Sequence, residues 1–126
     1  MIRGIGTDIC DIARIRKMVE SDKKDIFFAK VFTPLELEMG EKYKDPSTFF
    51  AGRWAAKEAL AKALGTGFGK SCRWLDIEIA RLESGAPELK LSKLTKETAD
   101  SLSVQSMHLS ISHEKETAVA FVILEG

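Results

Sequence analysis

Residues 53–65, RWAAKEALAKALG, carry two cations on the apolar side of what reads as a helix. At about 100° per residue, Lys57 falls roughly 40° from Arg53, and both lie within the stripe that holds Phe50 and Leu64. A bare buried ammonium costs on the order of several kcal/mol, so an anionic partner is expected. The pattern therefore predicts a site for a phosphorylated ligand. The alternative is that both side chains snorkel, covering apolar surface while their charged heads reach water.

A third cation and a glycine loop belong to the same stretch. Lys62 lies further round the helix, and Gly65-Thr66-Gly67 follows its end. Backbone N–H groups freed by glycines and flanking cations both attract phosphate. The loop stands at the C-terminal end of the helix, however, where the helix dipole is negative and opposes an anion. We therefore expect the cationic side chains to supply the attraction.

Two carboxylates could hold a metal ion. Asp8 ends the first apolar segment, GIGTD, and Glu58 lies just past the edge of the apolar stripe of the long helix. Such a pair would suit magnesium, a hard ion that takes one or two carboxylates and fills its shell with water and phosphate oxygens. The alternative for Asp8 is a turn or capping role, in which Asp11 competes with it. Sequence spacing alone does not show that the two carboxylates meet.

His113 is the third candidate, at the end of the alternating segment in LSISHEKE. Beside Ser112 and Glu114, it is either a functional group or a surface turn residue. A Ser–His–acid triad is the competing catalytic interpretation, but no GxSxG elbow accompanies it. His108, within the same segment, has no supporting pattern.

Periodicity and capping residues indicate the elements that position these side chains. Asp11 can cap a first helix, and Thr33-Pro34-Leu35-Glu36 has the form of a capping box with proline at the first helical position. Asp45-Pro46 repeats that device before the long helix, which Gly65 ends in a left-handed conformation. The predicted helices cover residues 12–19, 23–32, a short segment from 34, 46–64 and 92–103.

Alternating apolar residues indicate the strands. They are predicted over residues 2–10, 75–80, a partner segment with Leu89 and Leu91, 107–112 and 118–124. The last segment, AVAFVIL, is an unbroken apolar run, which predicts burial on both faces. We expect an α+β fold in which helices pack on a mostly antiparallel sheet.

Composition sets the limits of function. The 126 residues fit a single domain over residues 1–126, and 19 basic against 19 acidic side chains give no overall field for nucleic acid or a membrane surface. The two cysteines lie far apart without a metal-ligand pattern, which favours free thiols in a reducing compartment. The N-terminus lacks the apolar core of a signal peptide, and no run could cross a bilayer. We expect a cytoplasmic protein.

Three segments together resemble a known family. GIGTDICDIARI, FFAGRWAAKEALAKALGTG and LSISHEKETAVAFV are similar to the signature segments of holo-[acyl-carrier-protein] synthase, the short, homotrimeric class of 4′-phosphopantetheinyl transferases. The likeness runs from residue 2 to about residue 124, and the combination of GTD with WAAKEALAKA is its most specific part. It implies an α+β fold whose active sites lie between the subunits of a trimer.

The resemblance also implies roles for individual residues. Asp8 and Glu58 would bind Mg²⁺, and the phosphates of coenzyme A would contact Arg53, Lys57, Lys62 and the loop Gly65, Thr66 and Gly67. Glu58, Lys62 and His113 would be catalytic, with His113 at the edge of the pocket near the nucleotide. Arg14 and Met18 would dock an acidic acyl carrier protein. Cys10 and the stretch Asp11-Ile12-Ala13 depart from the family pattern, which puts the carrier preference in doubt.

The implied reaction transfers 4′-phosphopantetheine from coenzyme A to a carrier serine, releases adenosine 3′,5′-bisphosphate and serves fatty acid biosynthesis. The general base stays open between Glu58 and a metal-bound water. Two other functions compete. One is a non-catalytic trimeric module that binds coenzyme A or the carrier protein, and the other is a different magnesium-dependent enzyme that cleaves pyrophosphate.

Overall fold

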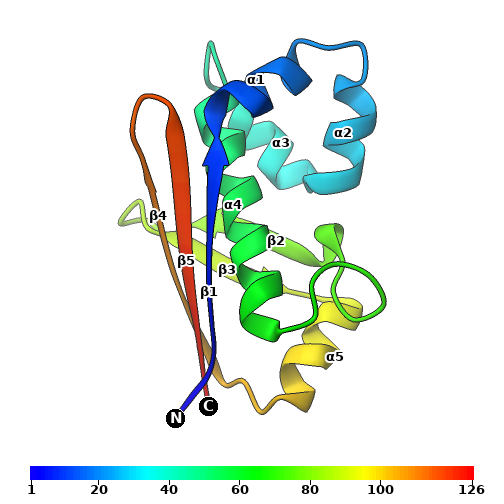
Figure 1. Cartoon of the computed structure of the whole chain (residues 1–126), viewed down its shortest axis with the longest axis vertical. Helices are drawn as coiled ribbons and strands as arrows, with labels where there is room; N and C mark the ends of the chain where they lie inside the picture. Colours follow the sequence, from blue (N-terminus) through cyan, green and yellow to red (C-terminus); the bar gives the residue numbers. More distant parts are fainter.

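The computed structural model describes all 126 residues; a first strand is followed by a run of helices, and two pairs of strands flank the last helix (Figure 1). They are β1 (Ile2–Asp11), α1 (Ile12–Val19), α2 (Lys24–Val31), α3 (Pro34–Gly40), α4 (Ser47–Leu64), the 3₁₀ turn η1 (Trp74–Asp76), β2 (Ile77–Arg81), β3 (Pro87–Leu91), α5 (Lys93–Ser101), β4 (Ser106–His113) and β5 (Thr117–Glu125). The α+β class predicted from the sequence is confirmed.

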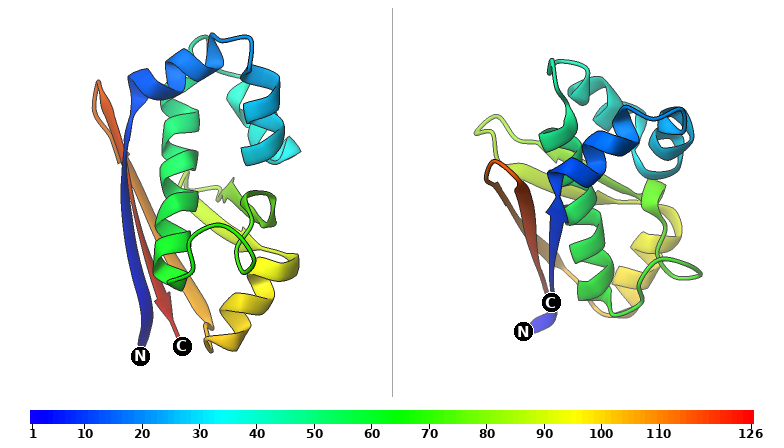
Figure 2. Two further views of the ribbon diagram at one scale, coloured as in Figure 1. Left: turned by 45° about the vertical axis from the view of Figure 1, so that its right-hand side comes forward. Right: turned by 45° about the horizontal axis from the view of Figure 1, so that its top comes forward.

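Helix α4 runs along a three-stranded sheet, with α1, α2 and α3 gathered at its N-terminal end and α5 near its C-terminal end (Figures 1 and 2). The strand order of this sheet is β1-β5-β4, and both pairs are antiparallel. Strands β2 and β3 form a second, two-stranded antiparallel sheet. The chain therefore has two sheets where the sequence suggested one.

Two glycines bring β1 directly against the backbone of α4. A Cβ atom at Gly4 would lie 2.0 Å from the carbonyl oxygen of Ala63, and one at Gly6 would lie 1.9 Å from that of Ala59. Neither clash could be relieved by rotating a side chain, because the obstacle is helix backbone. Asp8 continues the same face of the strand, since alternate residues of a strand share a face. The glycines thus carry Asp8 to the flank of α4.

The prediction that residues 118–124 are buried on both faces is wrong. Burial alternates along β5: Ala118, Ala120, Val122 and Leu124 are buried, whereas Phe121 is 41% exposed. The unbroken apolar run reflects a sheet whose inner face covers α4 and whose outer face is apolar but open within one chain. We call this outer face the open sheet face; its exposed apolar side chains include Ile5, Ile9 and Phe121.

The local predictions hold in part: a capping box is confirmed, and one strand begins later than predicted. The Thr33 side chain accepts a hydrogen bond from the Glu36 N–H, and the Glu36 carboxylate accepts one from the Thr33 N–H, which completes the capping box. Residues 75 and 76 lie in η1, so the strand predicted from residue 75 begins at Ile77. Cys10 and Cys72 are free, as expected; both are also buried, and burial raises the pKa of each to about 11. No helix combines the length and hydrophobicity that a bilayer crossing requires.

Candidate active site

Asp8, Glu58 and Lys62 form one cluster where β1 meets α4. The Lys62 ammonium donates to the Asp8 carboxylate at 3.0 Å and to the Thr7 carbonyl at 3.1 Å. Glu58 lies one helical turn before Lys62, so the two share a side of α4. Burial raises the pKa of Glu58, and the negative charge of Asp8 raises it further. Asp8 and Glu58 are therefore close enough to interact, as a shared cation site requires.

Lys57 has a structural role, which corrects its expected contact with coenzyme A. Its side chain is fully buried, and its Nζ donates to the Glu36 carboxylate at 2.7 Å, the Val31 carbonyl at 2.6 Å and the Trp74 carbonyl at 3.2 Å. Burial lowers the pKa of Lys57, and the Glu36 carboxylate opposes that change. The anionic partner that the sequence required is Glu36 itself, because three protein oxygens already satisfy the three ammonium donors.

Arg53, in contrast, has no protein partner for most of its guanidinium group. The residue is 6% exposed, its Cζ lies 4.3 Å from the centre of the Phe49 ring, and its Nε and Nη2 atoms are buried without a hydrogen bond. Burial, and then the nearby Arg81, lower the pKa of Arg53 to about 10. Buried unpaired donors are rare and costly in proteins, so this group calls for an anionic ligand.

Arg53 lines a pocket of about 430 Å³ together with Arg81 and His113. We call it the arginine pocket; its other walls are Tyr43, Asp45, Thr48, Phe49, Gly52, Gly85, Pro87 and Ile111. His113 thus lies beside Arg53, at the end of β4, and its predicted position near a nucleotide pocket is consistent with this geometry. Asp8, Glu58 and Lys62 do not line the arginine pocket.

The candidate residues therefore fall into two groups within one chain. Arg53 and Glu58 are five positions apart in α4, which separates them by roughly 140° around the helix axis and about 7.5 Å along it. The acidic cluster and the arginine pocket consequently face different sides of α4. A ligand that contacts both groups within one chain would have to pass around α4.

Gly65, Thr66 and Gly67 follow the end of α4, one turn beyond Lys62. All three are exposed, and Gly65 and Gly67 have φ values of +79° and +63°, which favour glycine. The Thr66 hydroxyl donates to the Gly67 carbonyl at 2.9 Å. The loop belongs with the acidic cluster, because Lys62 connects the two.

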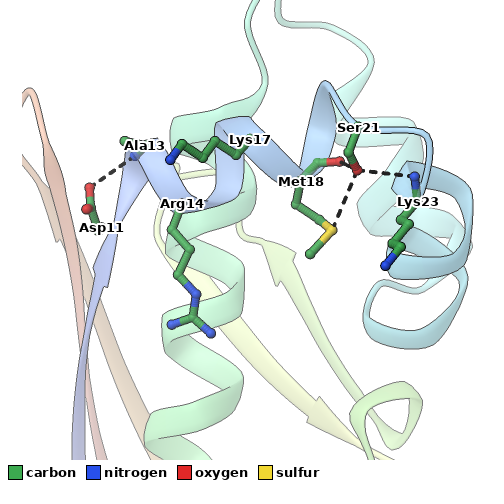
Figure 3. Close-up of a pocket in the computed structure, with 7 residues that line it drawn as sticks. All are labelled: Asp11, Ala13, Arg14, Lys17, Met18, Ser21 and Lys23. Atoms are coloured by element: carbon green, nitrogen blue, oxygen red, sulfur yellow. Dashed lines mark hydrogen bonds between the residues drawn. The ribbon is translucent and has the colours of Figure 1, made fainter.

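Arg14 and Met18 lie together on α1, as the sequence predicted. With Lys17 and Lys23 they line a surface pocket of about 410 Å³ (Figure 3). The Arg14 side chain points from α1 toward α4, where its Cζ lies 5.7 Å from the centre of the Trp54 ring. Met18 also lines a mostly apolar neighbouring pocket of about 230 Å³. This part of α1 offers positive charge and apolar surface side by side.

Sequence reasoning missed two functional neighbours. It treated Glu36 only as part of a capping box, yet the same carboxylate accepts bonds from Lys57 and from the Ile79 N–H at 2.8 Å. It also missed Arg81, which stands at the end of β2 and shares a pocket with Arg53 only through the tertiary fold. A buried lysine that needed an anion was the available indication for Glu36. Nothing in the local pattern marked Arg81.

Comparison with known proteins places these features in a family. Residues 4–122 match the model of the 4′-phosphopantetheinyl transferase superfamily. A holo-[acyl-carrier-protein] synthase of Clostridium novyi is 49% identical over 125 residues, which are 99% of this chain and 88% of that protein. The crystal structure of the synthase from Neisseria meningitidis has a TM-score of 0.91 at 34% identity and covers 100% of both chains.

A further solved structure, holo-[acyl-carrier-protein] synthase of Helicobacter pylori in complex with coenzyme A, has a TM-score of 0.85 at 40% identity, covering 96% of this chain and 99% of that one. The family model spans both the acidic cluster and the arginine pocket, so the match extends to every candidate residue described above. The chain belongs to the holo-[acyl-carrier-protein] synthases of the 4′-phosphopantetheinyl transferase superfamily.

Proposed function

We propose that the protein transfers 4′-phosphopantetheine from coenzyme A to a serine of apo acyl carrier protein. The observation that carries this proposal is the cluster of Asp8, Glu58 and Lys62 in a chain of this family, because it combines two carboxylates for a cation with an exposed lysine that can turn to phosphate. In the reaction the serine hydroxyl gives its proton to Glu58 or to a water molecule, and its oxygen forms a bond to the phosphorus that bears pantetheine. The pyrophosphate P–O bond breaks, and adenosine 3′,5′-bisphosphate leaves.

The acidic pair fits Mg²⁺. No group of three or more His, Cys, Asp and Glu side chains is arranged around a common point, but magnesium needs only one or two carboxylates when phosphate oxygens and water complete its shell. The Lys62 ammonium already lies on the Asp8 carboxylate, so a cation is favoured at this position. When bound there, the metal ion would neutralise charge on the pyrophosphate as the bond breaks.

Lys62 and the glycine loop are proposed to hold the phosphates at this cluster. The Lys62 side chain is 54% exposed, so it can turn from Asp8 to a phosphate oxygen once another cation takes its place. The Thr66 N–H stands beside it without an acceptor in the protein, whereas the Gly65 and Gly67 amides donate to the Lys62 and Ala61 carbonyls. Lys62 would then meet the charge that develops on the leaving phosphate.

Arg53 and His113 are proposed to hold another anionic part of coenzyme A, contributed by a neighbouring copy of the chain. The unpaired guanidinium donors of Arg53 support this, since a phosphate would satisfy them. The open sheet face supports assembly with other copies: Ile5 is 59% exposed and Ile9 71%, and exposed contiguous apolar surface indicates an interface. The resemblance to the family implies that the number of copies is three. Assembly would bring one copy's arginine pocket toward the next copy's Glu58.

An apo carrier incubated with the protein, coenzyme A and Mg²⁺ tests the proposed transfer. We expect intact-protein mass spectrometry to show the added phosphopantetheine mass on one carrier serine. Binding of coenzyme A or carrier without that mass would favour the non-catalytic module. Cleavage of pyrophosphate without a modified carrier would instead favour a different magnesium-dependent enzyme. The proposed role in fatty acid biosynthesis, in the cytoplasm, requires that the modified carrier is the carrier of the fatty acid pathway.

Arg14 is proposed to dock the carrier, because an acidic partner would complement the charge of α1. Arg14→Glu is expected to raise the Michaelis constant for the carrier by about tenfold, and more at low salt, since screening weakens surface charge pairs. Steady-state assays at two salt concentrations measure this. Lys96→Glu on α5, a charge reversal away from α1, is the matched control. Equal constants for wild type and Arg14→Glu would exclude α1 from the docking surface.

A further inference from the structure

The loop that follows α4 is held by one side chain and by backbone hydrogen bonds, in which the Gly65, Gly67 and Gly69 amides donate to the carbonyls of Lys62, Ala61 and Cys72. Among residues 65–70 only Phe68 is partly buried, and all the others are exposed. The loop contains three glycines with positive φ, Gly65, Gly67 and Gly69, and a Cβ at any of them would meet nothing within 4 Å. These glycines make the backbone conformationally free, so fixing the loop has an entropic cost.

Phe68 stacks on a column of aromatic rings. Its ring centre lies 3.7 Å from that of Trp74 with the planes 8° apart, and Trp74 stacks on Trp54 at 4.6 Å and 28°. We call these three rings the aromatic column. Its base is fixed twice, because Trp54 belongs to α4 and the Trp74 carbonyl accepts the bond from buried Lys57.

The column joins two parts of the molecule that the reaction must bring together. At one end, Phe68 follows Gly67 directly, beside the proposed phosphate contacts. At the other end, Arg14 of the proposed docking helix lies over the Trp54 ring. Since stacked aromatic pairs stabilise contacts beyond their buried area, the Phe68 ring can hold the glycine-rich backbone beside it in one position.

We propose that Phe68 is a positioning residue for coenzyme A: by stacking on Trp74 it holds the backbone of residues 65–67 in the conformation that receives the phosphates. The inference rests on the proposed function and assigns a role within that site. Phe68 does not touch the reacting atoms. Its contribution is to order the loop before coenzyme A binds, so that binding does not bear that entropic cost.

Phe68→Ala is the test variant, and Phe68→Tyr, which keeps the stacked ring, is the conservative partner. We expect Phe68→Ala to raise the Michaelis constant and the calorimetric Kd for coenzyme A by about tenfold, while kcat and the constant for the carrier stay within about twofold of wild type. Phe68→Tyr should restore wild-type values. Leu102→Ala removes another partly exposed apolar side chain, outside the site, and controls for general loss of packing.

Hydrogen exchange gives a readout that does not depend on turnover. Amides of residues 65–70 should exchange faster in Phe68→Ala than in wild type, and the rest of the chain should be unchanged. If wild type binds and transfers, but Phe68→Ala binds coenzyme A as tightly, or Phe68→Tyr is as impaired as Phe68→Ala, the positioning role is overturned while the proposed function stands. If wild type neither binds coenzyme A nor modifies a carrier, both proposals fail.

Discussion

Glu58→Gln is expected to lower kcat by on the order of a thousandfold, about 4 kcal/mol of transition-state stabilisation, because the substitution removes one of two charges that hold the metal ion. Asp8→Asn should have a comparable effect. Both amides are close to isosteric with the carboxylates, so circular dichroism and the unfolding midpoint should stay near those of wild type. Single-turnover transfer of phosphopantetheine to apo carrier, measured across magnesium concentrations, separates lost metal affinity from lost chemistry.

The control for this prediction is Glu38→Gln, which neutralises an exposed carboxylate on α3. Its turnover should match wild type. Near-normal rates for Glu58→Gln and Asp8→Asn at saturating magnesium would remove the metal assignment, since no step would then depend on the acidic pair.

The Glu58→Gln variant, mixed with an Arg53→Ala variant, also tests whether one active site is shared between two copies of the chain. An Arg53→Ala subunit keeps the acidic cluster, and a Glu58→Gln subunit keeps the arginine pocket. If the two groups meet across an interface, every mixed trimer holds one intact site of three, so random mixing should restore about a quarter of wild-type activity. Mixing by partial denaturation and refolding, followed by the transfer assay, measures this. Activity no higher than the mean of the two parents would place both groups in one subunit's site.

Lys57→Met is expected to lower the free energy of unfolding by about 3–5 kcal/mol, because it leaves the Glu36 carboxylate buried without its partner. Two backbone carbonyls, those of Val31 and Trp74, lose a donor at the same time. Urea unfolding followed by circular dichroism, at one fixed protein concentration, measures the change.

Lys62→Met is the matched control, since it removes the same charge from the same helix at a position that is 54% exposed. An exposed ion pair contributes about 0–1 kcal/mol, so its unfolding midpoint should stay near wild type while its transfer rate falls. Lys57→Met should therefore lose stability, whereas Lys62→Met should lose turnover. A Lys57→Met protein as stable as Lys62→Met would contradict the structural role of the buried pair.

Much of the fold could be predicted because local physics determines it. The capping box at Thr33 and the glycine that ends α4 were read correctly from sequence, since each depends on neighbours a few residues away. The burial of Arg53 and Lys57 was also predicted, from helical periodicity alone. What periodicity could not give was the partner of each cation. Glu36 reaches Lys57 only because α3 packs beside α4, and Arg81 reaches the arginine pocket from a separate sheet.

The apolar run of β5 shows a second limit. Two kinds of strand have similar sequences. One is buried on both faces within its own chain, and the other has one face that packs against another copy. Both require apolar residues on both sides. Phe121 therefore looked like a core residue, although it is 41% exposed in the structure. What distinguishes the two cases is whether another element of the same chain covers the outer face of the sheet.

Gly4 and Gly6 have a consequence for how the tolerance of this chain to mutation should be interpreted. Any side chain there would push β1 off the backbone of α4 and carry Asp8 away from Glu58. A saturation scan scored by growth would thus rank the two glycines with Asp8, although neither glycine offers a functional group. Intolerance to substitution in GIGTD would therefore reflect the close packing of the β1 backbone on α4 as much as the chemistry of Asp8.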